Sequence, residues 1–498
     1  MRQFQLIYGL LALFLPVSFA FAQEDEPVDY TAKYFQEDKT SQADTTQMDA
    51  WDIMNPLFLA DSNNVFRSNF GIMRVGDQQY IGFRLQPEFA FGKLGFGLDI
   101  PVFFNLDDGK FRSDAFENGA GPFRLFRYIR YGVKKRDPFY AKVGDLTGAY
   151  LGYGILINNY TNATSLERRK VGANIDIRVN NFIGLEAMYS DFNFASFNLF
   201  GMRPYVRPFG MTDIPIARTF EIGVSYVTDH DQTSTHFSDS VSYASQFLAD
   251  KGVSAFSADM GVNLVRTPFF NLLGYAQFAK INKIKSQVLA DTLEAMAPTH
   301  ELMADYKSGK GASIGLNAKL NFLGNVLRMD ARLERQWYSD YFIPQFFNAT
   351  YEINKDARIL QLTSATNQPG IYGSLYGMIL NKVRLGGSLL LPDKYDETNP
   401  ASVKLNADII NVLDNRLDIR GMYYKGGLAD LSDAFELDEQ SLAKVSVTYR
   451  IFKIFAAGID YYWTFARQED GRLDVDHQIL PYFGLNIPLY SNKQQTVK

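Results

Sequence analysis

Polar side chains, many of them charged, alternate with apolar ones in many segments of this chain. In the range 441–467, Lys444 and Arg450 lie on the polar parity of one apolar run, and Asp460 lies on the polar parity of the next. Successive side chains of a strand point to opposite faces of its sheet, so such charges would gather on one face. Acidic and basic groups at facing positions can form ion pairs or orient a polar solute. The pattern therefore predicts a charged wall.

The same alternation recurs along the chain and gives a set of candidate lumen-lining charges. They are Arg84, Glu88, Asp99, Lys142, Asp176, Arg178, Lys319, Arg328, Asp330, Arg332, Glu334, Lys404, Asp408, Asp418, Arg420, Lys444, Arg450 and Asp460. Bases and acids nearly balance, which favours ion pairs between neighbouring strands. The functional alternative is a transverse field that orients a polar solute at a narrow point.

A less balanced, basic cluster occupies 123–136, with Arg124, Arg127 and Arg130 at a period of three. A flat strand would point Arg127 to the lipid side. A bulge would resolve the conflict, as would a position close to the membrane surface, where arginine can extend to water. The functional interpretation of the cluster is a basic ladder that guides anions.

The segment 147–161 has neither clean alternation nor the composition of an ordinary loop. Its candidate contact residues are Tyr150, Tyr153, Asn158, Asn159 and Tyr160. Tyrosines, asparagines and glycines suit a constriction loop that folds back into a pore, where aromatic rings and amides can stack on sugars and hydrogen-bond to them. A distorted strand followed by an outer loop is the alternative interpretation.

No residue pattern predicts an enzyme, a cofactor or a metal site. His477 with Ser441 or Asp476 is the one hydrolase-like set that can be assembled, and nothing fixes its geometry. The spacing of His230 and His236 has no strong precedent as a metal site. The chain has no cysteine, which excludes disulfides, thiolate ligands and cysteine nucleophiles. Nothing resembles a nucleic-acid module, so no nucleic-acid partner is expected.

The N-terminus has the features of a secretory signal over residues 1–22. Arg2 precedes an apolar run, and Ala20 and Ala22 supply a cleavage site of small residues. The next segment, 23–64, is acidic and aperiodic, and two interpretations stay open: a periplasmic tail or a small plug. No later run reaches the ~20 apolar residues that a membrane helix needs. If the chain crosses a membrane, it must do so with strands.

Strand-like ladders begin at Val65 and recur to the C-terminus. Very short turns, such as 92–93 and 180–181, alternate with long polar loops, such as 229–253 and 282–310. This is the layout of an outer-membrane barrel with its short turns in the periplasm. We expect helices in the loops, around Leu289 and Leu293 and at 240–250. An aromatic girdle is expected at the loop-side strand ends, formed by Trp337, Tyr338, Trp463 and Phe465.

The last ladder ends in Gly484-Leu485-Asn486-Ile487-Pro488-Leu489. It resembles the C-terminal strand signal of outer-membrane barrels, with aliphatic residues in place of the usual aromatics and a tail, 491–498, beyond it. Most of the chain, 65–490, resembles porin-like bacterial outer-membrane barrels. The expected fold is all-β: a transmembrane antiparallel up-and-down β-barrel of about 18–20 strands with some helical loop insertions.

The resemblance and the charged inner face together predict a function in the outer membrane of a Gram-negative bacterium. The favoured hypothesis is a porin-like channel for passive diffusion of small polar or charged solutes. The alternative is a plugged barrel that serves as a partner platform or as an accessory in secretion or envelope assembly. Outer-membrane lipid, the barrel-assembly machinery during biogenesis and proteins bound through the long outer loops are the expected partners.

Overall fold

A computed structural model of the chain describes most of residues 65–488. The ranges outside this description are 1–64, 76–77, 92, 113–124, 133, 136, 147, 163–169, 193–196, 231–251, 268, 297–302, 304, 323–325, 350, 353–354, 381, 396–399, 436–440, 453, 468–472 and 489–498. The expected signal segment, the acidic segment 23–64 and the C-terminal tail therefore lie outside the described residues. The same holds for the helix expected at 240–250.

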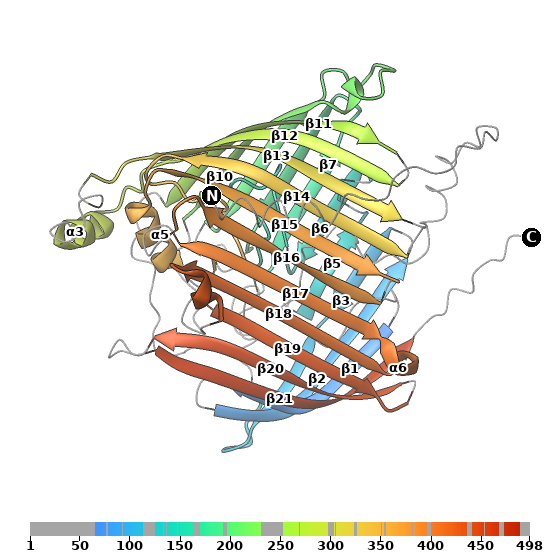
Figure 1. Cartoon of the computed structure of the whole chain (residues 1–498). Coiled ribbons are helices and arrows are strands. Elements are labelled where there is room, and N and C mark those ends of the chain that lie inside the picture. Colours follow the sequence, from blue (N-terminus) through green and yellow to red (C-terminus); the bar gives the residue numbers. More distant parts are fainter. Residues whose placement is uncertain are drawn as a thin grey trace, which may run out of the picture. The chain divides into compact units, whose positions relative to one another are not determined.

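The described residues form one antiparallel sheet of 21 strands, drawn in Figure 1. The first eleven are β1 (Val65–Val75), β2 (Gln78–Phe91), β3 (Leu94–Leu98), β4 (Ile100–Asn105), β5 (Phe126–Tyr131), β6 (Phe139–Gly144), β7 (Gly172–Arg178), β8 (Ile183–Tyr189), β9 (Phe200–Val206), β10 (Glu221–Asp229) and β11 (Val253–Arg266). The other ten are β12 (Phe270–Ile281), β13 (Gly309–Phe322), β14 (Leu327–Tyr338), β15 (Gln368–Ile379), β16 (Val383–Pro392), β17 (Ala401–Asn411), β18 (Leu417–Leu428), β19 (Ser441–Arg450), β20 (Phe455–Arg467) and β21 (Leu473–Pro488).

The sheet closes on itself because β1 pairs with both β2 and β21. Each strand otherwise pairs with its neighbours in sequence, so the topology is up-and-down. A closed ring of antiparallel neighbours needs an even number of positions. β3 and β4 satisfy this requirement by sharing one position: both pair with β2, and the break between them falls at Asp99. The predicted all-β barrel is confirmed.

The outward face of the barrel is apolar. In β10, Ile222 and Val224 are exposed, whereas Glu221 and Ser225 on either side of this pair are buried. In β19, Val445 and Val447 are exposed, whereas Ser446 is buried. Exposed aliphatic and aromatic side chains recur on this parity in strands around the ring. Such an apolar exterior, with polar residues on the inner parity, is the pattern of a barrel that faces lipid.

The two ends of the barrel differ in the length of their connections. One end, the turn end, carries the short connections 179–182, 267–269, 323–326, 380–382 and 451–454, as well as α6 (Val412–Asn415), which is a tight turn. The other end, the loop end, carries the long connections, including α3 (Gln287–Met296), α5 (Lys355–Ser364) and η6 (Leu431–Phe435) (Figure 1). α3 confirms the helix expected around Leu289 and Leu293, whereas α5 was not predicted. The asymmetry is that of an outer-membrane barrel.

One connection departs from the predicted layout. The segment 207–220, which contains η4 (Ala217–Thr219), joins β9 to β10 at the turn end, where only short turns were expected. Alternation in this part of the sequence is weak because η4 and its flanking turns follow the strand directly. Among the described residues, no helix is long and apolar enough to cross a membrane.

Candidate functional site

The interior of the barrel holds charges that pair across neighbouring strands. Arg84 forms an ion pair with Asp99, and Arg450 forms one with Asp418. Asp408 lies 3.5 Å from Arg384 of the preceding strand, and Ser446 donates a hydrogen bond of 2.7 Å to Asp460. Buried charges need such partners because each would otherwise carry an unopposed desolvation cost. The wall is therefore polar and largely compensated.

The structure places the other candidate charges as follows. The buried ones are Asp176, Lys404, Asp408, Asp418, Arg420 and Asp460, and the half-buried ones are Lys142, Arg178 and Arg328. Two further ion pairs form: Lys319 lies 3.4 Å from Asp330, and Arg332 pairs with Glu334. Glu88 and Lys444 lie in β2 and β19, but their side chains are outside the description, as are those of Trp463 and Phe465 in β20.

The basic cluster at 123–136 lies partly on β5, where a register irregularity changes the side-chain parity. Gly97 of β3 faces Tyr128, but the next residue, Leu98, faces Phe126, so Arg127 is an extra residue. Arg127 is buried beside the exposed Phe126 and Ile129. A bulge of this kind lets one strand bury Arg127 and still present its apolar residues to lipid. Arg124 lies outside the described residues.

Segment 145–162 lies inside the barrel and is held against the inner wall. Backbone hydrogen bonds between Ala149 and Tyr160, of 2.8 and 2.9 Å, close a neck at its base. Beyond the neck, the Ile155 N–H donates to Gln277 of β12 at 3.0 Å, and the guanidinium of Arg332 of β14 donates to the Tyr153 carbonyl. The Tyr153 ring stacks on Tyr275, with ring centroids 4.7 Å apart. Residues far apart in the sequence therefore fix one inward loop.

The chain turns into the lumen at the end of β6 through Gly144, which has a φ of 123°. A Cβ at this position would lie 2.3 Å from the Arg127 carbonyl oxygen. Both the backbone angle and the close approach require glycine. The last residue of β6, just before the inward loop, is therefore one that only glycine fits without strain.

The constriction-loop candidates take different positions. Tyr160 is fully buried and donates a hydrogen bond to Glu352, and the Asn158 amide lies 3.4 Å from the Tyr372 hydroxyl of β15. Tyr150 and Asn159 are half-buried. The segment runs beside 345–347 of the β14–β15 connection, since the Phe347 N–H donates to Leu156 and the Asn158 N–H donates back to Phe347. Two inward segments therefore support each other.

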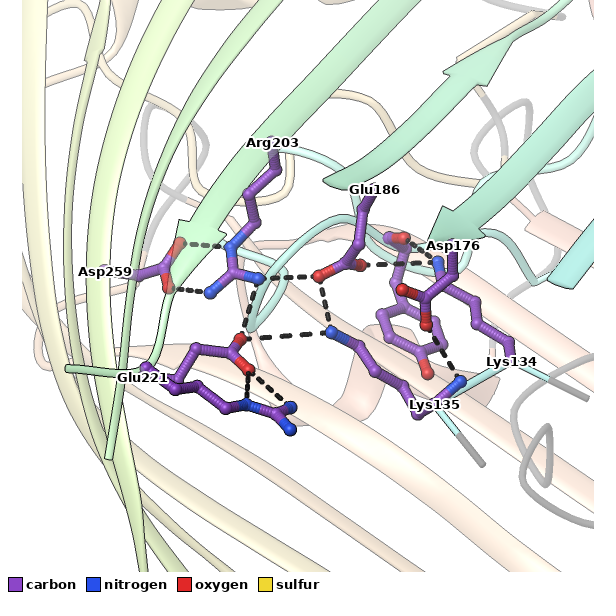
Figure 2. Close-up of polar contacts among 9 residues, drawn as sticks. Lys134, Lys135, Asp176, Glu186, Arg203, Glu221 and Asp259 are labelled. Atoms are coloured by element: carbon purple, nitrogen blue, oxygen red, sulfur yellow. Dashed lines mark hydrogen bonds and ion pairs between the residues drawn. The ribbon is translucent and has the colours of Figure 1, made fainter. Parts of the chain in front are cut away.

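A buried network of opposite charges fills the space between the inward loop and the wall at β8 to β11 (Figure 2). Arg203 lies at its centre, 2.6 Å from Glu186 and 2.8 Å from Glu221, and its Nε donates to Asp259 at 2.9 Å. Lys134 and Lys135 enter from the turn 132–138. Lys135 contacts Glu186, and the Lys134 ammonium donates to the Tyr150 carbonyl at 2.7 Å. Burial lowers the pKa of Lys134 below its usual value.

Sequence reasoning missed two parts of this network. Lys134 and Lys135 belong to the basic cluster 123–136, whose sequence does not indicate that Lys134 is almost fully buried. Arg203 is not among the lumen-lining charges expected from the sequence. The alternation along β9 does place Arg203 on the inner face, because Gly201, Arg203 and Tyr205 are buried between less buried neighbours.

A second buried network joins the loop-end segments. Glu352 lies 2.7 Å from Lys170 and 3.4 Å from Lys355, and Lys355 also lies 3.0 Å from Asp229 at the end of β10. Burial alone would raise the pKa of Glu352, but the two ammonium groups outweigh it and hold that pKa below its usual value. The network ties α5 and its approach to the barrel wall.

Tyr338 does not belong to an outward aromatic girdle. It is buried, its hydroxyl bonds to Gln336, and its ring packs on Phe342 at 6.1 Å, so it lies on the inner face of β14. Its neighbour Trp337 is exposed on the outer face. Adjacent strand residues cannot both face lipid, which corrects the prediction for Tyr338.

The described residues hold no group of three or more metal-ligating side chains. His236 lies outside the description, and the side chains of Asp476 and His477 do as well. The hydrolase-like set suggested by the sequence therefore lies largely outside the described side chains.

No family model matches this chain, and no curated protein matches it. Among solved structures it is similar to OccK11 (OpdR) of Pseudomonas aeruginosa, with 11% identity, a TM-score of 0.31, and coverage of 86% of this chain and 95% of the other. It is similar to the outer membrane protein OprD of Pseudomonas aeruginosa, with 10% identity, a TM-score of 0.32, and coverage of 85% and 92%. It is also similar to a BenF-like porin of Pseudomonas fluorescens Pf-5, with 10% identity, a TM-score of 0.32, and coverage of 85% and 97%.

Proposed function

We propose that this barrel is an outer-membrane channel for passive diffusion of small polar or charged solutes, narrowed from within by segment 145–162. The observation that carries the proposal is this inward loop, fixed to the wall through Gln277 and Arg332. A barrel wider than about 16–18 strands leaves an aqueous channel unless something fills it. An inward loop on a charged wall narrows such a channel while keeping its lining polar.

Single-channel recording in planar lipid bilayers tests the proposal. Because Ala149 and Tyr160 close a neck, 150–159 can be replaced by Asn-Gly, a sequence suited to a two-residue turn, without moving β6 or β7. The folded native protein should give small stepwise conductances, and the shortened variant should give several-fold larger steps. The double variant Asp108→Asn with Lys110→Gln, at an exposed ion pair in another connection, is the control and should match the native protein.

The second candidate is a plugged barrel that acts as a partner platform, and the loop-end core favours it. Phe346, Phe347 and Tyr351 are fully buried together with Ile359 of α5, so loop segments pack into a rigid apolar body. This candidate would be supported if the shortened variant conducted ions and the folded native protein did not. Silence from both folded proteins would overturn the channel proposal.

A further inference from the structure

A cavity of about 440 Å³ lies at the turn end and shares Lys135 and Arg207 with the buried network described above. The connections 132–138, 179–182 and 207–220 surround it, together with the ends of β11 and β12. Small-molecule sites typically occupy about 300–1,000 Å³. The cavity is therefore large enough for a small solute.

The cavity is lined by five cationic side chains, and none of its ten described lining residues is acidic. The cations are Lys135, Arg178, Arg207, Arg218 and Arg266. They come from four separate parts of the chain, which is why no run of basic residues marks the site in the sequence.

Strand parity brings three of these arginines to the inner side. Arg178 follows the buried Asp176 at the end of β7, and Arg207 continues the parity of Arg203 beyond β9. In β11 the register shifts between Asn263 and Val265. The shift keeps Arg266 opposite Asn271 of β12, while Leu264 and Val265 are both exposed.

The carboxylates of the adjacent buried network are already compensated. The adjacent network sets Lys134, Lys135, Arg203 and Arg207 against Asp176, Glu186, Glu221 and Asp259, four charges of each sign. Glu221 accepts from Arg207 at 2.8 and 3.0 Å. Arg218 and Arg266 line the same cavity and add positive charge beside this balanced group.

The geometry points to a binding site for a small multiply charged anion, a carboxylate- or phosphate-bearing solute. Guanidinium forks bind both groups through paired hydrogen bonds. Asn181, Asn263 and Asn271 add neutral amide groups to the lining. This inference names the solute class of the proposed channel and to that extent rests on it, although binding can be measured without conduction.

Isothermal titration calorimetry tests the inference: citrate or inorganic phosphate is titrated into the full chain in a neutral, lipid-free detergent. Saturable binding that weakens with added salt is expected. The double variant Arg218→Gln with Arg266→Gln should weaken citrate binding about tenfold or more, because two guanidinium groups can no longer donate charge-assisted hydrogen bonds to the carboxylates. Lys382→Gln removes one exposed charge from another turn at the same end and should bind as the native protein does.

A parallel titration with phosphatidylglycerol micelles separates a dissolved solute from a lipid headgroup. Binding of the lipid without binding of citrate or phosphate would overturn the inference. So would the absence of saturable binding, or equal affinity in the native protein and the double variant, once an unchanged unfolding temperature has shown that the variant is folded. A conducting protein that fails to bind refutes this inference alone, and a binding protein that never conducts refutes the channel alone.

Discussion

At the scale of single residues, the interior depends on compensation between charges. Arg203 is fully buried and forms ion pairs with three carboxylates. Glu186 is fully buried, and Glu221 and Asp259 are each 6% exposed. By contrast, Arg335 pairs with Asp393 across an exposed strand end. Loss of the arginine should therefore lower the free energy of unfolding much more at Arg203 than at Arg335, because only the buried carboxylates have lost their hydration.

Replacing Arg203 by glutamine should lower the free energy of unfolding by about 3–5 kcal/mol, because it leaves buried carboxylates uncompensated. Urea unfolding of the refolded protein in detergent measures the change. Arg335→Gln, the exposed counterpart, should cost less than about 1 kcal/mol. Equal losses in the two variants would show that the network of Figure 2 is not buried as described.

At the scale of elements, irregular positions in strands decide what faces inward. The bulge at Arg127 in β5 and the register shift at Leu264 in β11 each add one residue and restore the parity of charge inside and apolar side chains outside. Gly144 ends β6 with a positive φ, just before the inward loop begins. These local departures from alternation position the basic residues and the inward loop.

Replacing Gly144 by alanine should destabilise the barrel by about 1–3 kcal/mol, because the φ of 123° strains any L side chain and the Cβ would meet the Arg127 backbone. Gly373 of β15 is the matched control, since a Cβ there would meet no atom closer than 3.9 Å. Gly373→Ala should change stability by less than about 0.5 kcal/mol. Thermal loss of the compact band on electrophoresis provides the measurement, and an unaffected Gly144→Ala variant would contradict the proposed turn.

At the scale of the whole molecule, closure of β1 on β21 removes both sheet edges and separates two environments. The side chains of adjacent residues in one strand should then alternate between the lipid and the lumen. Leu375 of β15 is exposed on the outer face, and its neighbour Ser374 lies on the opposite parity. The absence of native cysteines makes this difference measurable without background.

Cysteine variants of these two positions should react differently with a charged, membrane-impermeant thiol reagent after reconstitution into vesicles. Ser374→Cys should react because the lumen is polar, whereas Leu375→Cys should be protected by lipid until the membrane is dissolved. Mass spectrometry counts the labelled fraction. Faster labelling at Leu375→Cys than at Ser374→Cys would contradict the assignment of faces.

The sequence by itself determined the barrel. A period of two with charges on one parity, repeated between short turns and long loops, indicates a barrel whose apolar face contacts lipid. This could be predicted because the side-chain alternation of a strand depends only on its local sequence. It also predicted the helix around Leu289 and Leu293 and singled out 147–161 as unlike a strand.

Only the tertiary structure decided how the interior is filled. The contacts of Tyr153 with Tyr275 and of Glu352 with Lys170 join residues more than a hundred positions apart, and no local pattern encodes them. The five cations of the turn-end cavity likewise come from four separate parts of the chain, which the fold brings together. Closure of the ring sets distances between strands that alternation within one strand cannot specify.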